Sequence, residues 1–141
     1  METIDIQDNL KSYLLERYEW YEAQLLDGVR AAGYSSLTPA QARVFGRLKG
    51  QSRNISDLAK LLQVSRQAAQ KTVAGLVEMG LLELTPCPEN KSAKVVSITK
   101  QGHQLRQVAA EEMTKIESRI AKKIGQEAFD NLKQCMRVSW D

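Results

Sequence analysis

Two long amides and two cationic side chains lie close together in the middle of this chain. They directly follow Ser65 and are Arg66, Gln67, Gln70 and Lys71. An arginine can donate two hydrogen bonds to a guanine, and a glutamine can make a similar paired contact with an adenine. A lysine ammonium suits a phosphate better than a base edge. One helix that presented all four side chains would have the chemistry needed to read DNA in the major groove.

The segment from Ser65 to Gly80 has the pattern of such a helix. Ser65 is a good N-cap, and a glycine commonly ends a helix. The inner face is expected to hold the apolar residues that recur every three or four positions, which are Ala69, Val73, Leu76 and Val77. Ser65 and Thr72 could add hydrogen bonds to phosphates. The outer face has one acid, Glu78, at its far end, whereas a merely solvated face usually mixes charges of both signs.

A shorter helix is predicted just before it, so that the two form a helix-turn-helix. Asn54 can cap this helix, and Gln63 and Val64 can make the turn. Its inner residues are expected to be Leu58, Ala59, Leu61 and Leu62.

Two further helices are predicted upstream of the helix-turn-helix. Thr38, with Gln41 three residues later, forms a capping box, and Pro39 suits the first helical position. That helix is expected to run to about Lys49 and to bury Val44, Phe45 and Leu48. The segment 6–32 also has apolar residues at mostly helical spacing.

The second half of the chain changes character. Two short apolar runs, 81–85 and 94–98, flank a proline-containing loop, which predicts a β-hairpin. A long helix is predicted over 99–124 and a short one over 126–138. The predicted fold class is therefore mostly α with a small β part (α+β). Six helices and a two-stranded β-wing would form a winged helix-turn-helix.

Charge is distributed unevenly along the 141 residues. Residues 1–32 have a net charge of −4, residues 33–103 of +6 and residues 104–141 of +1. The predicted DNA-reading helix lies in the basic block, which would attract a polyanion such as nucleic acid. A solvated basic surface is the alternative interpretation.

Composition argues against several other classes of protein. Cys87 and Cys135 are too few for a disulfide framework or a zinc site, and the single His103 has no cluster of ligands near it. Cys135 is expected to be buried. There is no Gly-rich phosphate loop, paired-carboxylate motif or nucleophile motif, so an enzyme, a metal site and a cofactor are not expected. The first residues lack a signal-peptide core, and no apolar run could span a bilayer, which favours the cytoplasm.

Five segments within residues 37–102 have a recognisable order and spacing. They are Leu-Thr-Pro-Ala-Gln-Ala-Arg-Val at 37–44, Leu-Ala-Lys-Leu-Leu at 58–62, Val-Ser-Arg-Gln at 64–67, Thr-Val-Ala-Gly-Leu-Val-Glu-Met-Gly-Leu at 72–81 and Val-Ser-Ile-Thr-Lys-Gln-Gly at 96–102. Each segment alone is a weak signal. Together they resemble the MarR family of winged-helix transcriptional regulators, and the flanking helices fit that family in number and length.

The resemblance implies a homodimer. In that family the first helix and the last two helices of each subunit interlock in a dimerisation layer. The chain would then be one integrated domain with an N-terminal dimerisation helix (1–36), a DNA-binding lobe (37–99) and C-terminal dimerisation helices (100–141). Two recognition helices about one DNA turn apart, roughly 34–36 Å, would favour a pseudopalindromic operator. The alternative is that the terminal helices only cover the lobe of their own subunit.

The resemblance also implies a small-molecule effector between the dimerisation layer and the lobe. The tentative pocket residues are Tyr13, Arg17, Tyr18 and Tyr21, with Trp20 beside them. Aromatic packing in the dimer interface is the alternative role for each of these side chains.

The sequence departs from the family pattern in the wing. It has Asn90-Lys91-Ser92-Ala93 where an acid followed by arginines is usual. Asn90, Lys91 and Lys94 would contact the backbone or a flanking minor groove, but a lysine fits a narrow minor groove less well than an arginine. The recognition helix is therefore expected to supply more of the specificity. Gln63 stands where a glycine is common, so a strained or differently shaped turn is expected.

The leading hypothesis is a dimeric, sequence-specific DNA-binding transcriptional regulator, in its simplest form a repressor that occludes a promoter. Its expected partners are double-stranded DNA, a second copy of the chain and a small effector, and no membrane. The alternative is a winged-helix protein-interaction module with little DNA affinity. Salt dependence would separate the two, because DNA binding releases counterions.

Overall fold

The computed structural model describes residue 6 and residues 8–90 and 93–141. Within these residues the chain forms six helices and three short strands. They are α1 (Leu10–Ala31), α2 (Pro39–Leu48), β1 (Arg53–Asn54), α3 (Ile55–Leu62), α4 (Arg66–Glu78), β2 (Leu82–Pro86), β3 (Lys94–Ile98), α5 (Lys100–Ile124) and α6 (Gln126–Arg137). The predicted helices and hairpin are confirmed, although the first helix begins at Leu10 and not near residue 6.

Local hydrogen bonds define where the helices of the lobe begin. The Thr38 hydroxyl accepts from the Gln41 amide, and the Gln41 side chain accepts from the Thr38 amide, which completes the predicted capping box. Asn54 and Ser65 cap α3 and α4 in the predicted way. These caps satisfy amide groups that the first helical turn would otherwise leave unpaired.

The predicted two-stranded wing is part of a three-stranded antiparallel sheet with the order β1-β3-β2. The hairpin pairs Leu82 with Ile98 and Pro86 with Lys94. The additional strand, β1, pairs with β3 through only two residues, Arg53 and Asn54. A strand this short has no apolar alternation for a sequence pattern to reveal, and Asn54 was already assigned as a helix cap.

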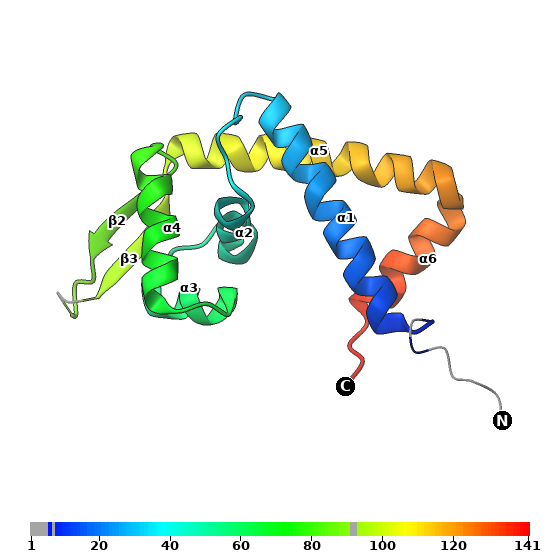
Figure 1. Cartoon of the computed structure of the whole chain (residues 1–141), viewed down its shortest axis with the longest axis horizontal. Coiled ribbons are helices and arrows are strands. Elements are labelled where there is room, and N and C mark those ends of the chain that lie inside the picture. Colours follow the sequence, from blue (N-terminus) through cyan, green and yellow to red (C-terminus); the bar gives the residue numbers. More distant parts are fainter. Residues whose placement is uncertain (1–5, 7, 91–92) are drawn as a thin grey trace.

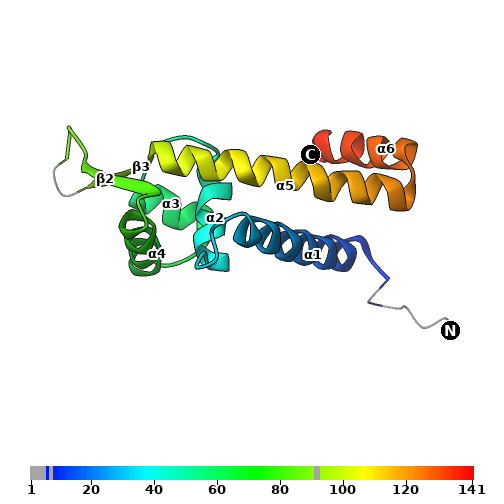
Figure 2. The ribbon, with the colours of Figure 1, turned by 90° about the horizontal axis from the view of Figure 1, so that it is seen from above.

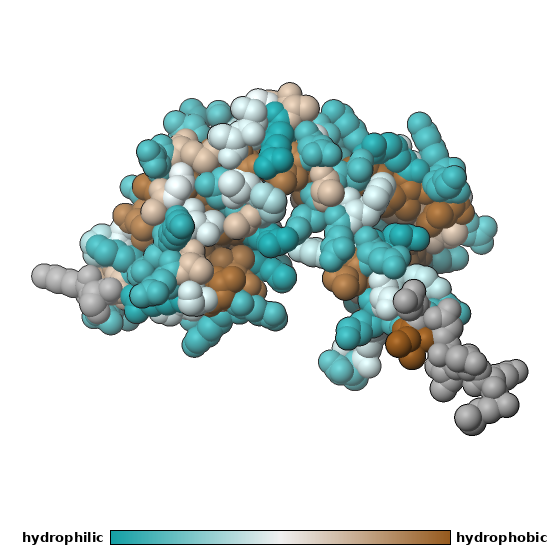
Figure 3. Space-filling view, in the orientation of Figure 1, coloured by the Kyte–Doolittle hydropathy of each residue, from teal (hydrophilic) through white to brown (hydrophobic). Residues whose placement is uncertain are grey.

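Two parts of the molecule are joined by the long helix α5 (Figure 1). The sheet and α2, α3 and α4 gather around its first turns, and this part is called the lobe below. Farther along, α1 lies beside α5, and α6 folds back against its last turns (Figure 2). In the space-filling view the two parts meet along the upper edge, with an open notch beneath (Figure 3).

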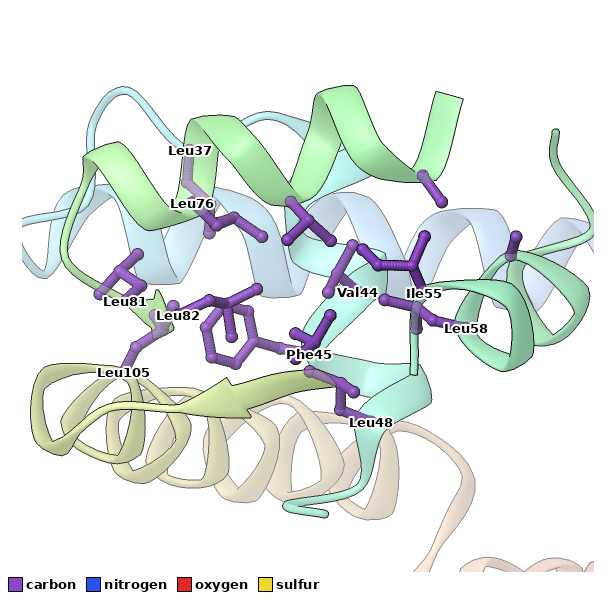
Figure 4. Close-up of a cluster of buried hydrophobic side chains, with 14 of the residues drawn as sticks. Leu37, Val44, Phe45, Leu48, Ile55, Leu58, Leu76, Leu81, Leu82 and Leu105 are labelled. Carbon is purple, nitrogen blue, oxygen red and sulfur yellow. The ribbon is translucent and has the colours of Figure 1, made fainter. Parts of the chain in front are cut away.

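The hydrophobic core lies inside the lobe, where α2, α3, α4, the sheet and the start of α5 converge (Figure 4). The predicted inner residues of α2 (Val44, Phe45 and Leu48) are all buried. The rest of the core comes from Leu37, Ile55, Leu58, Ala59, Ala69, Val73, Leu76, Leu81, Leu82, Val96 and Leu105, together with Leu26 and Val29 of α1. This packing gives the lobe a rigid frame on which α4 is held.

Some residues predicted to be buried are exposed. Leu61 of α3 and Val77 of α4 retain 38% and 36% of their accessible surface. Each lies at the edge of its helix's inner face, next to a residue that is more deeply buried, Leu62 in α3 and Leu76 in α4. Cys135 is also exposed, because the outer face of α6 packs on nothing within the single described chain.

Candidate functional site

The polar side chains of α4 lie on its outer face. Arg66, Gln67, Gln70 and Lys71 are all exposed. On the opposite face Ala69, Val73 and Leu76 are fully buried in the core. Because packing fixes the buried face of α4, it also fixes the direction of the opposite face, which presents the amides and cations outward. This is the arrangement that a major-groove helix requires.

The two hydroxyl groups predicted to bind phosphate have different local partners. Ser65 Oγ accepts a hydrogen bond from the Ala68 amide at 3.0 Å, which leaves its own hydrogen available. Thr72 is half-buried, and its Oγ1 donates to the Ala68 carbonyl at 3.1 Å. A phosphate oxygen would therefore compete with that carbonyl for the Thr72 hydrogen. Of the two hydroxyls, Ser65 is better placed to donate to DNA.

The turn before α4 has the unusual geometry expected from its lack of glycine. Gln63 has φ 56° and ψ 42°, in the left-handed region that disfavours side chains with a Cβ. The Val64 amide donates to the Ala59 carbonyl at 3.1 Å, and the Gln63 amide donates to Lys60. These bonds close the C-terminus of α3 and set the direction in which α4 begins.

Within the lobe, β2 and β3 form the wing, which reaches outward past α4 (Figure 2). Asn90 and Lys94 are exposed, whereas the predicted contact residue Lys91 lies outside the described residues. The Cys87 amide donates to the Ala93 carbonyl at 2.9 Å, and the Asn90 amide donates to the Cys87 carbonyl at 3.3 Å. Backbone hydrogen bonds therefore continue beyond the paired strands as far as Asn90 and Ala93.

A cavity of about 560 Å³ lies between α1, α2 and α5, where the lobe meets the terminal helices. Its walls are mainly apolar and include Leu25, Leu26, Val29, Leu37, Ala42, Phe45, Leu105, Ala109, Ala110 and Met113. Of the tentative pocket residues, Tyr18 and Tyr21 line this cavity. Tyr13 and Arg17 do not, and neither does Trp20.

A hydrogen-bonded ion pair forms part of the cavity wall. Arg43 Nη2 and Nε lie 2.7 and 3.0 Å from the two carboxylate oxygens of Glu22, and the Tyr18 hydroxyl donates to Glu22 at 2.8 Å. The hydrogen bonds from Arg43 lower the pKa of Glu22, and this effect exceeds the opposing effect of partial burial. The hydrogen bond to Glu22 raises the pKa of Tyr18. The pair thus joins α1 to α2 as a charged unit.

The remaining charges of the wall are cationic. Arg47, Lys49 and Arg106 line the cavity, and among the described residues none of them forms an ion pair with a carboxylate. Arg106 Nη1 lies 3.3 Å from Nδ1 of His103. With Arg43 counted, the wall has four cations and one carboxylate. An apolar cavity with this excess of positive charge is suited to an anion that also has an apolar ring or chain.

Tyr21 connects three helices at the edge of the cavity. Its hydroxyl donates to Glu117 of α5 at 2.6 Å, and Lys133 of α6 lies 3.4 Å from the same carboxylate group. Burial raises the pKa of Tyr21, and the hydrogen bond to Glu117 adds to the shift. Tyr13, by contrast, donates to Asp8 near the start of α1. Tyr21 therefore joins α1 to α5 through its hydrogen bond to Glu117, and it also lines the cavity.

Sequence reasoning missed the charged residues of this cavity. Glu22 lies one helical turn after Tyr18, and Arg43 and Arg47 are four residues apart on a helix that was predicted. That spacing places each pair on one helix face. The spacing alone could not show that these faces lie opposite each other, because α1 and α2 meet only through the tertiary fold.

In the described part of the chain no helix combines the length and apolar character needed to cross a membrane. The same residues include no group of three His, Cys, Asp or Glu side chains arranged to hold a metal ion.

One known protein family matches part of this chain. Residues 35–91 match the model of the MarR family. No curated protein matches the sequence. The solved structure of MarR is similar over 96% of this chain and 92% of its own, with a TM-score of 0.75 and 18% identity. The predicted resemblance to the MarR family is thus confirmed over residues 35–91.

Two other solved structures share the fold. The transcriptional repressor CouR, bound to a 23-mer DNA duplex, has a TM-score of 0.73 and 22% identity, over 96% of each chain. NadR, in complex with 4-hydroxyphenylacetate, has a TM-score of 0.71 and 18% identity, over 96% of this chain and 95% of its own. At these identities the likeness establishes the fold.

Proposed function

We propose that this chain, which has a MarR-family winged helix, is a dimeric, sequence-specific DNA-binding repressor that acts in the cytoplasm. Its recognition helix is α4, and its operator is pseudopalindromic. The proposal rests on one observation above all: Arg66, Gln67, Gln70 and Lys71 are exposed on a helix whose other face is locked in the core. CouR, which shares the fold, has been solved on a DNA duplex, and this supports the same use of the fold here.

The direct test is to titrate the protein with its own upstream DNA at several salt concentrations. We expect the affinity to fall about 10³-fold or more between about 50 and 200 mM salt, because several phosphate contacts release counterions. A scrambled duplex of equal length should bind far more weakly. A flat salt dependence, or equal affinity for both duplexes, would contradict the proposal and favour the protein-interaction module.

A dimer is supported by the apolar side chains that the terminal helices leave uncovered. The exposed apolar residues of α1, α5, α6 and the adjoining C-terminal residues include Leu10, Leu15, Trp20, Met113, Ile124, Leu132, Met136, Val138 and Trp140. Apolar surface is visible over this part of the molecule in Figure 3. A patch of this extent marks an interface more often than a free surface. Residues 1–36 and 100–141 would then form the dimerisation layer, and residues 37–99 the DNA-binding lobe.

Leu132→Glu should convert the dimer into a monomer. Leu132 keeps 49% of its surface exposed on α6, so an isolated chain would tolerate the glutamate, whereas a buried interface would not. Light scattering after size exclusion would measure the mass. Leu61→Glu is the matched control, because Leu61 is an exposed leucine of α3 outside the terminal helices. If the wild type and the Leu132 variant had equal masses, Leu132 would not belong to a dimer interface.

The cavity is the proposed effector site. Its apolar walls and excess of cations favour an aromatic carboxylate, and Tyr18 and Tyr21 provide ring faces beside it. NadR, which has the same fold, was solved with 4-hydroxyphenylacetate, a molecule of this class. Binding at the junction between the lobe and the terminal helices would change the placement of α4 and so the affinity for the operator.

A further inference from the structure

One residue joins the end of α4 to the beginning of α5. The Thr99 hydroxyl donates to the Gly80 carbonyl at 2.6 Å and accepts from the Gly102 amide at 3.1 Å. The Thr99 amide donates to the Leu81 carbonyl at 3.2 Å. Gly80 and Leu81 follow the C-cap of α4, and Thr99 is the N-cap of α5. Thr99 therefore holds two consecutive peptide groups at the end of α4 while it caps α5.

These two peptide groups are fixed to the last turn of α4. Gly80 has φ 76°, the left-handed conformation that often closes a helix. Its amide donates to the Val77 carbonyl at 2.9 Å, and the Leu81 amide donates to the Leu76 carbonyl at 3.0 Å. A hydrogen bond to the Gly80 carbonyl therefore acts on α4 as a whole.

α4 and α5 otherwise pack on different elements. α4 packs mainly on α2, α3 and β2, whereas α5 packs mainly on α1, α6 and β3. The C-terminal end of α4 meets the first turn of α5, and the rest of α4 extends away from it (Figure 1). With 13 residues α4 is roughly 20 Å long, so a tilt of about 5° at this end would move Arg66 by about 2 Å.

We propose that Thr99 is a positioning residue for DNA binding, whose hydroxyl sets the direction of α4 relative to α5. This inference rests on the proposed function, because the two α4 helices of a dimer must fit two half-sites at a fixed separation. In the proposed dimer α5 belongs to the dimerisation layer, so the angle between α5 and α4 sets that separation. Loss of the bond to Gly80 widens the range of separations and leaves the side chains of α4 unchanged.

Thr99→Asp distinguishes this role from helix capping. Aspartate can still accept from the Gly102 amide, but its ionised carboxylate has no hydrogen to donate to the Gly80 carbonyl. Thr38→Asp is the matched control, because Thr38 is an exposed N-cap of the same lobe whose hydroxyl accepts from Gln41 of its own helix. Both variants gain the same negative charge. Thr99→Ser keeps both hydrogen bonds and should behave as the wild type.

The first measurement uses three duplexes made from the upstream DNA, with the native half-site separation or with one base pair more or less. We expect Thr99→Asp to reduce the preference for the native separation by about fivefold, the equivalent of one hydrogen bond. Thr38→Asp and Thr99→Ser should keep the preference. A purely structural loss would weaken binding to all three duplexes alike. If the aspartate prevents folding, Thr99→Val removes the same bond without adding charge.

The second measurement needs no DNA. Spin labels on Gln67→Cys and Glu111→Cys, both at exposed positions, report the distance between α4 and α5 in a chain that also has Cys87→Ser and Cys135→Ser. Dilution with unlabelled protein isolates the distance within one chain. The loss of the Thr99 hydroxyl should widen the distance distribution, and the control should not.

An unchanged distance distribution, or an unchanged preference for the native separation, in the Thr99→Asp or Thr99→Val variant would overturn the positioning role. A wild type that binds none of the three duplexes would overturn the proposed function, and the spin-label distances would still decide whether Thr99 sets the direction of α4.

Discussion

Arg66→Ala should weaken operator binding by about 1–3 kcal/mol, roughly 5- to 150-fold in Kd. Arg66 is exposed in the first turn of α4, where its guanidinium can make two hydrogen bonds with a guanine. Its loss removes base contacts and charge together, so the preference for one base at that position should relax as well. Fluorescence anisotropy with operators varied one base pair at a time would measure both effects.

Two matched variants separate base reading from charge. Lys71→Ala should weaken binding to all sequences alike and reduce the salt slope by about one, because its ammonium is assigned to a phosphate. Arg17→Ala removes the same charge as Arg66→Ala, from an exposed position on α1. It should leave operator binding unchanged. If all three variants lost affinity equally, binding would depend on net charge and α4 would not be reading bases.

Gly102→Ala should destabilise the fold by about 3 kcal/mol and lower Tm by roughly 10 °C. Gly102 is buried in the first turn of α5, and an added Cβ would lie only 2.2 Å from the Leu81 carbonyl oxygen and 2.7 Å from Ile98 Cγ2. The backbone of Leu81 cannot move freely, because its carbonyl also accepts from the Thr99 amide at 3.2 Å. The substitution would therefore push α5 away from the sheet.

Gly46→Ala is the control for this prediction. Gly46 is exposed within α2, and a Cβ there would meet no atom within 4 Å apart from its chain neighbours and the backbone of its own helix. The substitution should be neutral or stabilise by about 0.5–1 kcal/mol, because alanine favours the helix. Urea denaturation would measure both free energies of unfolding. A Gly102 variant as stable as the Gly46 variant would show that the close contact with Leu81 can relax.

The helices of the lobe were predictable from the sequence alone. Thr38, Asn54 and Ser65 begin their helices as predicted, and Val44, Phe45 and Leu48 are buried as predicted. Caps depend on hydrogen bonds between residues about three positions apart, and burial follows the helical repeat. Both are properties of neighbouring residues, so they appear in the order of the chain. The exposed polar face of α4 follows from the same repeat.

Other features depend on residues far apart in the sequence. The pairing of β1 with β3 joins Arg53 to Val96. The cavity joins Glu22 to Arg43, and the close contact of α5 joins Gly102 to Leu81. In each case the residue types nearby in the sequence do not indicate which distant residue will be in contact.

The sequence by itself thus determined the set of helices, the chemistry of the α4 side chains and the family resemblance. Only the tertiary structure decided that the sheet has three strands and that an ion pair forms part of the wall of a cationic cavity between α1, α2 and α5. The physical reason is that the first group depends on periodicity and local hydrogen bonds. The second depends on how separate helices pack, which is decided by the shape of the whole core.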